Sequence, residues 1–543
     1  MNPTLTIDQD WTYLLSEPGQ SELIKALHSY LPSCRWFQSK ARQMESISIL
    51  DVIPMENMPT QLVILDVAYN NINDEVYLLP IKFVTGENAR AIVEAYPNAA
   101  IMPLQCRQDG RQVDGQLIDA VYDERFRRGI LNVIGEQLHM DGGVGAVDAD
   151  RTTAFDDLNS PGLDAQSGLL GKEQSNTSVR YGNVLVLKLM RKLEEGTNPE
   201  LEIGRFLTEE TAITHVPLLA GYIQYTQSQH APTTVAVLQA FVENQGDAWE
   251  FTLDWLTKWF QSGILDHEAT ALPDGSLMTL AAAPIPDDVR AAIGDYIDKA
   301  YLLGQRTAEL HVALASGTDE RFRPVDFSMD YQRELHTSID QMSDRIFQLL
   351  RERLHNLPDA VVQHGQSILD QEAEIREVFN VLDSYDIPGK RIRGHGDYHL
   401  GQVLYTGDDF VIVDFEGEPA RPLPERYLKH SPLRDVAGML RSFHYAAYGV
   451  LPGFGLQTPI PPDQLPRAEP WACYWRLWTS VAFLRGYLDH VEPAHITPPE
   501  HADFDLLLRN LVMEKAVYEL GYEINNRPGW LKVPAQAIMR NSA

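Results

Sequence analysis

One block of the sequence, residues 394–419, constrains the fold more than any other stretch. It reads GHGDYHLGQVLYTGDDFVIVDFEGEP, and Asp397 precedes Gln402 by five positions. The turn-forming residues TGDD separate the apolar runs VLY and FVIV, which predicts a short hairpin. The second run leads directly into Asp414. The sequence therefore predicts a loop with a carboxylate and an amide, joined through a hairpin to a second carboxylate.

This set of side chains is typical of phosphoryl transfer to an alcohol. That reaction needs a carboxylate beside the hydroxyl, oxygen ligands for a metal ion and a cation on the nucleotide phosphates. His395, Gly396 and Asp397 followed by Gln402 have the spacing of a kinase catalytic loop, with Gln in place of Asn. Asp397 is the expected catalytic residue, and Gln402 and Asp414 are the expected Mg²⁺ ligands. A plain loop followed by a strand end is the alternative interpretation.

A lysine on a strand and a glutamate on the following helix favour the kinase interpretation. Lys188 ends the apolar run VLVLK, and Glu202 lies fourteen positions later in NPELEIGRFL. We expect Lys188 to hold the phosphates of ATP and Glu202 to orient Lys188. For Lys188 alone, a strand lysine beside solvent is the alternative.

The segment EQSNTS, residues 173–178, is a candidate phosphate loop. Its hydroxyls, amides and turn-prone backbone suit phosphate oxygens, and the candidate residues are Ser175, Asn176 and Thr177. A plain hairpin is the alternative. A Walker A loop is not present, because GLLGKE lacks the required glycine spacing.

The run VLQAFVENQGDAWEF has the character of a hinge between two lobes. Backbone groups of Gln239, Phe241 and Val242 would bind adenine there, with apolar side chains on either side. A buried strand with a polar exit explains the same pattern.

A helix near the C-terminus presents hydrogen-bonding and aromatic groups on one face. In EKAVYELGYEINNRPGW these groups recur at intervals of three and four, as Lys515, Tyr518, Glu519, Tyr522 and Glu523. Aromatic rings beside carboxylates and a lysine suit a polyhydroxylated sugar. The expected substrate contacts are Lys515, Tyr518, Glu519, His444, Tyr445 and His395. A solvated surface stripe is the default alternative.

Composition excludes several kinds of partner. Lys plus Arg number 45 against 76 Asp plus Glu, for a net charge of −31, and no long basic tract occurs, so nucleic acid is not expected. The three cysteines are far apart and form no CxxC pair, which fits a reducing cytoplasm. No apolar segment approaches the roughly 20 residues that span a bilayer, so no membrane association is expected.

Changes of pattern along the chain predict three parts. Residues 1–90 read as a small α+β unit, and residues 91–240 end in a strand, strand, helix order that we assign to nucleotide binding. Residues 241–543 are mostly helical and include the catalytic loop and sugar site. Pro- and Gly-rich stretches near 266–289 and 448–470 are expected to be insertions or long loops, of a role that the sequence does not define.

Several motifs together resemble bacterial maltokinase, a family also found as the C-terminal part of trehalose synthase fusions. They are SNTSVRYGNVLVLKLMRK, AFVENQGDAWEFT, the 394–419 block, LRDVAGMLRSFHYAAYG, EKAVYELGYEINNRPGWL and, near the N-terminus, LPSCRWFQSKAR. The resemblance implies an α+β, bilobal fold of the eukaryotic-protein-kinase and aminoglycoside-phosphotransferase kind. It adds an N-terminal α+β cap subdomain and a mostly helical C-lobe.

The resemblance also implies a reaction, in which maltose and ATP give maltose 1-phosphate and ADP for α-glucan and glycogen synthesis. Asp397 would then act on the anomeric hydroxyl, Gln402 and Asp414 would bind Mg²⁺, and Glu416 would join the metal shell or contact the sugar. Trehalose synthase is the implied functional or physical partner. The alternatives are a related sugar or aminosugar kinase, such as a glucosamine kinase, and a non-catalytic pseudokinase subunit of a trehalose/glycogen assembly. The acceptor sugar, the oligomeric state and the preferred nucleoside triphosphate are not set by the sequence.

Overall fold

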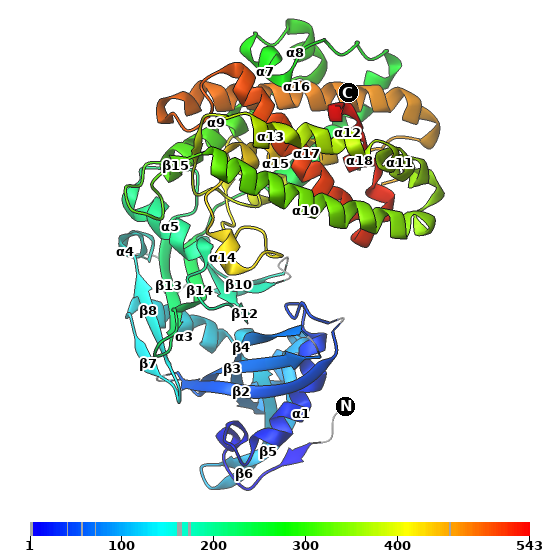
Figure 1. Cartoon of the computed structure of the whole chain (residues 1–543). Coiled ribbons are helices and arrows are strands. Elements are labelled where there is room, and N and C mark those ends of the chain that lie inside the picture. Colours follow the sequence, from blue (N-terminus) through cyan, green and yellow to red (C-terminus); the bar gives the residue numbers. More distant parts are fainter. Residues whose placement is uncertain are drawn as a thin grey trace. The chain divides into compact units, whose positions relative to one another are not determined.

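The chain forms two compact units (Figure 1). The computed structural model describes residues 4–40, 42–55, 58–70, 72–159, 166–171, 175–454 and 458–542. The first unit comprises Met1–Glu209 and Pro217–Val242, and the second comprises Glu210–Val216 and Glu243–Ala543. The first unit is built on sheets and the second is mostly helical. The expected α+β class is confirmed.

The first unit begins with a mostly antiparallel sheet in the order β1-β5-β6-β4-β3-β2, and β12 pairs with β4. Helix α1 (Gln20–Tyr30) packs on this sheet, because its Leu23 and Leu27 share a core with Val63 and Leu65 of β3. The strands are β1 Leu5–Thr6, β2 Met44–Pro54, β3 Thr60–Tyr69, β4 Ile72–Thr85, β5 Ala100–Gln108, β6 Arg111–Asp119 and β12 Lys192–Leu193.

The boundary predicted near residue 90 falls inside this sheet. Strand β6 pairs with both β4 and β5, so the segments before and after residue 90 form one layer. Helix α2 (Gly86–Ala95) is only the connection between β4 and β5. The prediction failed because a helix between two strand runs looks the same in the sequence whether or not the strands pair.

A second, antiparallel sheet in the same unit has the order β7-β8-β13-β14-β11-β10-β9. The predicted order of strand, strand and helix is present as β10, β11 and α5. After β11 the chain continues through Arg191 into β12 of the first sheet, so the strand that carries Lys188 joins the two sheets. The elements are α3 Glu124–Gly135, β7 His139–Asp141, β8 Ala146–Arg151, α4 Thr153–Asn159, β9 Ser167–Leu170, β10 Asn176–Tyr181, β11 Leu185–Met190, α5 Pro199–Glu210, β13 Leu219–Thr226 and β14 Thr233–Ala240.

The second unit is a helical assembly that includes two small two-stranded sheets, β15 with β16 and β17 with β18. The long helices α9 and α16 pack closely because each places a glycine, Gly304 and Gly486, against the backbone of the other. The helices are α6 Ala248–Gln261, α7 Leu277–Ala282, α8 Asp287–Ile293, α9 Tyr296–Leu314, α10 Met329–Arg353, α11 Asp359–Asp370, α12 Glu372–Glu377, α13 Val381–Ser384, α14 Leu423–Arg426, α15 Leu433–Gly449, α16 Leu465–Val491, α17 His501–Asn526 and α18 Lys532–Ser542. The strands are β15 Val325–Asp326, β16 Lys390–Arg391, β17 Val403–Tyr405 and β18 Phe410–Ile412.

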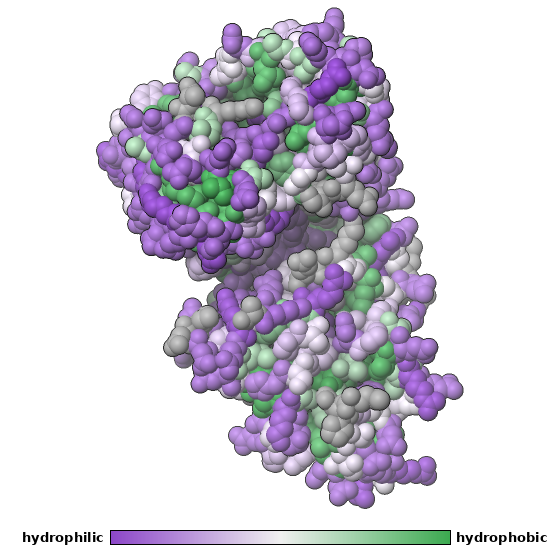
Figure 2. Space-filling model, turned by 90° about the vertical axis from the view of Figure 1, so that its right-hand side faces the viewer, coloured by the Kyte–Doolittle hydropathy of each residue, from purple (hydrophilic) through white to green (hydrophobic). Residues whose placement is uncertain are grey.

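The Pro-rich stretches are partly helical. The first contains α7, which packs against α16, and the second leads into the start of α16. On the face shown in Figure 2, hydrophilic residues cover most of each unit and hydrophobic residues surface as separate patches. Among the described residues, no helix has the length and apolar character needed to cross a membrane.

Candidate functional site

The predicted hairpin is present in the second unit. Val403 pairs with Ile412, and Tyr405 with Phe410, so the short turn returns the chain beside the catalytic loop. The N–H of Val413 then donates to the carbonyl of Gln402 at 3.0 Å. The backbones of the two expected Mg²⁺ ligands, Gln402 and Asp414, therefore lie side by side, as the spacing in the sequence predicts.

Asp414 adopts a backbone conformation that is uncommon outside glycine. Its φ is +70°, in the left-handed region. Such a conformation outside glycine costs on the order of 1–3 kcal/mol and persists where neighbouring contacts enforce it. Here the preceding residue, Val413, is fixed on both sides, since its N–H bonds to Gln402 and its carbonyl accepts from His395 Nε2 at 2.9 Å. The strain identifies Asp414 as a candidate functional residue independently of the motif.

His395 supports the loop from inside. Its side chain is buried, its ring bonds to the Val413 carbonyl, and it packs against Tyr398 and Phe415. A ring enclosed in this way does not contact a substrate, so the predicted substrate contact by His395 is wrong. The motif predicted the position of the residue but not the direction of its side chain.

Asp435, at the start of α15, anchors the catalytic loop. Its carboxylate accepts the backbone N–H of His395 at 2.8 Å and of Gly396 at 3.1 Å, and His311 Nε2 donates to it at 3.2 Å. Burial alone would raise the pKa of Asp435, but the bonds and charges of His311 and His395 outweigh burial and lower the pKa to about 2. The sequence analysis missed this residue, whose only signal was an acid inside the apolar run LRDVAGML.

A glycine lets the loop approach the same helix. A Cβ at Gly438 of α15 would lie 2.5 Å from the carbonyl oxygen of Tyr398, the residue after Asp397. Only glycine fits this approach without moving the loop backbone. Asp435 and Gly438 lie one helical turn apart and together fix where Asp397 stands.

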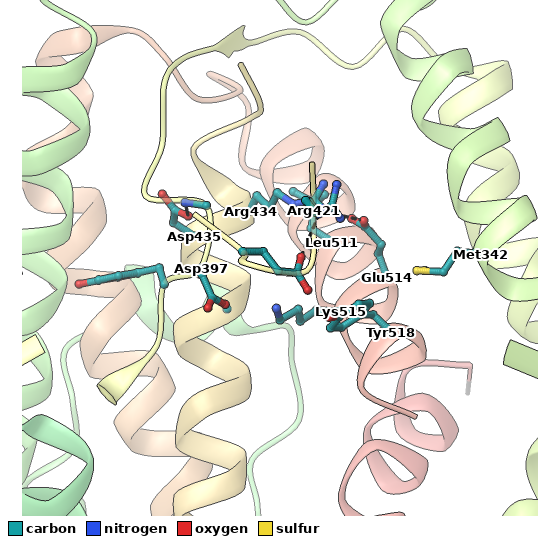
Figure 3. Close-up of a pocket in the computed structure, with 13 residues that line it drawn as sticks. Met342, Asp397, Arg421, Arg434, Asp435, Leu511, Glu514, Lys515 and Tyr518 are labelled. Atoms are coloured by element: carbon teal, nitrogen blue, oxygen red, sulfur yellow. Dashed lines mark hydrogen bonds and ion pairs between the residues drawn. The ribbon is translucent and has the colours of Figure 1, made fainter. Parts of the chain in front are cut away.

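A small cavity of about 30 Å³ opens beside Asp397 within the second unit (Figure 3). That volume holds roughly one water and is too small to enclose a sugar. Figure 3 shows Lys515 extending from α17 toward the loop that carries Asp397. The lining residues are Met342, Gly396, Asp397, Tyr398, Glu418, Arg421, Arg434, Asp435, Gly438, Leu511, Glu514, Lys515 and Tyr518.

The lining carboxylates other than Asp397 are already paired. Arg434 contacts Glu514 at 2.7 Å, and Arg421 contacts Glu418 at 2.9 Å. Burial alone would raise the pKa of Glu418, but the charge of Lys515 and the hydrogen bonds from Tyr518 and Arg421 lower it. Burial and the bond to Glu418 also raise the pKa of the Tyr518 hydroxyl, which therefore stays a donor. Two of the predicted sugar-contacting residues, Lys515 and Tyr518, line this cavity.

The other three predicted sugar contacts lie between helices. Glu519 of α17 accepts two hydrogen bonds from Arg441 of α15, at 2.8 and 2.6 Å, and Arg441 also contacts His444. Tyr445 donates to Glu523 at 3.0 Å. This polar layer joins α15 to α17, so the assignment of His444, Tyr445 and Glu519 to a sugar wall is corrected. A helix face rich in polar groups can be satisfied by a neighbouring helix as well as by a ligand.

In the first unit, Lys188 pairs with a different glutamate from the predicted one. Its Nζ lies 3.7 Å from Glu200 Oε2, and Glu200 is buried. Positions two apart on a helix differ by about 200°, so Glu202 faces away from the side that Glu200 presents. Glu200 is therefore a carboxylate next to Lys188 that the sequence analysis did not name, and the orienting role of Glu202 stays a prediction. The spacing predicted the helix correctly.

The expected adenine-binding segment is largely engaged in the sheet. Gln239 lies between Val186 and Leu219 on neighbouring strands, and its side chain donates to Glu200 at 2.8 Å. The N–H of Phe241 donates to the carbonyl of Val184 at 2.7 Å. These bonds contradict the prediction that Gln239 and the Phe241 N–H bind adenine. Adenine binding by Val242 stays a prediction.

The residues of the candidate phosphate loop lie on two different faces of the sheet. Thr177 stands opposite Leu189 in the β10–β11 pair, whereas Lys188 stands opposite Ser178, and opposed residues share a face. The side chain of Thr177 therefore lies on the other face of the sheet from Lys188, which contradicts a phosphate contact through its hydroxyl. Asn176 shares the face of Lys188 and remains a candidate together with Ser175, while residues 173 and 174 lie outside the described residues.

The hydroxyl of Thr177 bonds instead to a buried arginine. Arg191 Nε donates to Thr177 Oγ1 at 2.7 Å, and Arg191 Nη2 lies 2.8 Å from Asp119. The guanidinium also stands over the Trp36 ring, 4.8 Å from its centre. Trp36 and Asp119 belong to the N-terminal sheet region, so this part of the chain supports the candidate phosphate loop from behind.

The donor set of the 402–416 segment fits a magnesium ion. One amide and the carboxylates of Asp414 and Glu416 are hard oxygen donors, which Mg²⁺ prefers. The residues present are thus of the kind that the expected metal requires. Their roles as ligands stay predictions.

Sequence comparisons with known proteins identify a matching family domain and two relatives. Residues 30–123 match the maltokinase N-terminal cap domain. A glucosamine kinase of Mycolicibacterium smegmatis (strain ATCC 700084 / mc(2)155) is 26% identical over 369 residues, which cover 67% of this chain and 77% of the relative. One from Streptacidiphilus jiangxiensis is 25% identical over 368 residues, covering 67% and 70%.

A solved structure extends the likeness to the whole fold. A glucosamine kinase in complex with glucosamine, ADP and inorganic phosphate matches with a TM-score of 0.59 at 17% identity, covering 97% of this chain and 99% of that chain. The predicted bilobal kinase-like fold with an N-terminal cap is confirmed. The cap match, the two relatives and this fold together support a likeness of the chain to maltokinases.

Proposed function

We propose that this protein is a sugar kinase that transfers the γ-phosphoryl group of ATP to the anomeric O1 of maltose, giving maltose 1-phosphate and ADP. The observation that most directly supports this proposal is the charge balance of the cavity beside Asp397. Among its described lining residues, Glu418 and Glu514 are each paired with an arginine, and Asp435 is bonded to the loop backbone. The acceptor side therefore suits a neutral, hydroxyl-rich ligand.

An aminosugar would meet a less suitable environment. An ammonium group needs a carboxylate that is free to pair with it. In the described lining, Glu418 and Glu514 are paired with arginines, Asp435 is bonded to the loop backbone, and Asp397 is assigned to the acceptor hydroxyl, while Arg421, Arg434 and Lys515 are cations. A like charge placed beside them is repelled, and displacing either arginine from its partner leaves an unpaired, partly buried charge. Sugar hydroxyls, by contrast, can accept from Lys515 and can donate to the Tyr518 oxygen, whose own proton is bonded to Glu418.

The proposed mechanism uses Asp397 on the acceptor. Its carboxylate accepts the O1 proton while O1 attacks the γ-phosphorus, and the bond to the β-γ bridging oxygen breaks to release ADP. Lys515 orients the sugar beside Asp397, and Asp435 and Gly438 hold the loop in place. Lys188, oriented by Glu200, neutralises charge on the nucleotide phosphates. Gln402, Asp414 and Glu416 are the residues that would hold Mg²⁺, which supplies charge neutralisation of the phosphates when bound.

A glucosamine kinase is the second candidate, favoured by the relatives. The two relatives described above bear that name, and each is about one quarter identical to this chain. The match of residues 30–123 to the maltokinase cap and the paired carboxylates favour maltose instead. Trehalose synthase, as a supplier of maltose, remains the proposed functional partner.

The deciding experiment measures ADP release by the purified protein with ATP and Mg²⁺. The acceptors are maltose, glucose, glucosamine, trehalose and a buffer blank, and NMR locates the phosphate on the product. Maltose-selective turnover at O1 supports the proposal. Glucosamine-selective turnover would replace maltose by the second candidate, and no turnover with any sugar would favour a non-catalytic role.

A further inference from the structure

A cluster of charged residues ties the chain segment 210–216 to the strand that precedes Asp414. This segment begins at the last residue of α5 and belongs to the second unit, whereas α5 up to Glu209 and β13 belong to the first. It is therefore one of the places where the chain passes between the units. Its backbone is fastened at His215, whose carbonyl accepts the N–H of Ile412 at 2.9 Å.

That bond places His215 against the edge of β18. Ile412 pairs with Val403 on its other side, and the chain reaches Asp414 two residues later. The His215 carbonyl thus satisfies an edge of the hairpin that would otherwise face water or an unrelated partner. Because Asp414 holds a strained φ of +70°, the position of the strand leading into it must be enforced by such contacts.

The side chain of His215 is fixed by groups from two other elements. Its Nδ1 lies 3.3 Å from Glu309 of α9 and its Nε2 lies 3.3 Å from Asp409 in the hairpin turn. Arg306 of α9 binds Asp409 with two hydrogen bonds, at 2.8 and 2.7 Å, and also contacts Glu309 at 2.9 Å. Thr214 Oγ1 is a further polar neighbour of the ring, 3.3 Å from Nδ1. One imidazole therefore joins the segment 210–216, the helix α9 and the catalytic hairpin.

The charged cluster around His215 is partly shielded from solvent. The side chains of His215 and Arg306 are 23% and 13% exposed. Burial alone would raise the pKa of Asp409, but the bonds from Arg306 and the Phe410 N–H outweigh burial and lower it. Pairs that are partly buried are screened less by solvent than fully exposed ones.

We infer that His215 is a positioning residue for the metal site: it holds strand β18, and through that strand Asp414, in the geometry needed to bind Mg²⁺. This inference rests on the proposed function for its kinetic consequences. Its structural consequence, a fixed Ile412 N–H, does not depend on which sugar is used or on turnover.

The test compares His215→Ala, His215→Gln and the matched control His139→Gln. His139 is also flanked by two carboxylates, Asp148 and Asp141, but it lies on strand β7 of the first unit and has no link to the hairpin. The first readout is hydrogen–deuterium exchange of the amides of residues 410–414 without nucleotide. The second is the Mg²⁺ concentration that gives half-maximal ADP release at saturating ATP and sugar.

We expect His215→Ala to speed exchange at Ile412 and to raise the half-saturating Mg²⁺ concentration by about tenfold, the effect of losing roughly one hydrogen bond to a charged group. The KM for the sugar should change less than about twofold, since Asp397 and Lys515 are untouched. His215→Gln, whose amide can still bond to a carboxylate, should recover part of both effects. His139→Gln should behave as wild type.

The inference is overturned if His215→Ala exchanges like wild type over residues 410–414. It is also overturned if the variant only lowers the active fraction, with kcat reduced and the Mg²⁺ dependence unchanged. If the wild-type protein turns over no sugar, the proposed function fails, while the exchange measurement still decides the role of His215.

Discussion

The carboxylate of Asp435 accepts the backbone N–H of His395 at 2.8 Å, across forty positions of sequence. It accepts Gly396 as well, so one buried side chain holds both residues that precede Asp397. Backbone groups in a loop have no ladder of their own and need such partners. The placement of the catalytic carboxylate therefore depends on a residue in another helix.

This bond predicts an acid-sensitive contribution to folding. The pKa of Asp435 is lowered to about 2 in the folded chain from 3.8, so the group stabilises the fold fully above about pH 4. The contribution is lost as the pH falls toward 2, because the carboxylate then becomes protonated in the folded state as well as in the unfolded state. A pKa shift of one unit corresponds to about 1.36 kcal/mol, so we expect Asp435 to contribute about 2 kcal/mol to the free energy of unfolding.

The measurement is the free energy of unfolding by urea at pH 7 and at pH 3, for wild type and Asp435→Asn. The variant should be less stable than wild type at pH 7, and the difference should shrink at pH 3. Asp330→Asn is the control, since that carboxylate is 92% exposed. An equal loss at both pH values would contradict the charge-based explanation.

Replacing Asp397 by Asn should abolish most turnover while leaving the protein folded. The amide keeps the shape of the side chain but cannot accept the acceptor's proton, and a positioned general base contributes typically 10²–10⁴-fold. We expect kcat to fall by about that factor, with ADP affinity and melting temperature near wild type. A variant with kcat close to wild type would show that Asp397 does not have this role.

Gly438→Ala should displace the catalytic loop. The added Cβ would stand 2.5 Å from the Tyr398 carbonyl, a backbone atom that cannot rotate away. Overpacking of this kind costs typically 1–3 kcal/mol, and we expect kcat to fall as well because Asp397 is the neighbouring residue. Gly529→Ala is the matched control, since nothing lies within 4 Å of its added Cβ. Unchanged kcat and stability in Gly438→Ala would mean that the loop tolerates the shift.

Local patterns predicted the parts of the site that depend on neighbouring residues. The 394–419 block spans few residues, so strand alternation and turn chemistry were enough to predict the hairpin and the approach of Gln402 to Asp414. The directions of His395 and Thr177 were not predictable in this way, because they depend on which face of a strand or loop meets the core. The interface role of Glu519 required knowing that α15 supplies Arg441.

The ion pair between Lys188 and Glu200 provides a direct test of the proposed nucleotide site. Glu200 and Glu202 lie on the same helix, two positions apart, and Glu200 Oε2 lies 3.7 Å from Lys188 Nζ. Substituting either by Gln keeps the size of the side chain and removes one charge, so the two variants are matched. If Glu200 orients Lys188 toward the nucleotide, the KM for ATP should rise about tenfold in Glu200→Gln.

Glu202→Gln should change the KM for ATP less than about threefold, because it lies on a different side of the helix. The KM for the sugar should be unaffected in both variants. Lys188→Ala should resemble Glu200→Gln, and adding Glu200→Gln to it should have little further effect, since the two residues act as one unit. The reverse order, with Glu202→Gln more damaging than Glu200→Gln, would restore the pairing predicted from spacing alone and would mean that α5 turns when nucleotide binds.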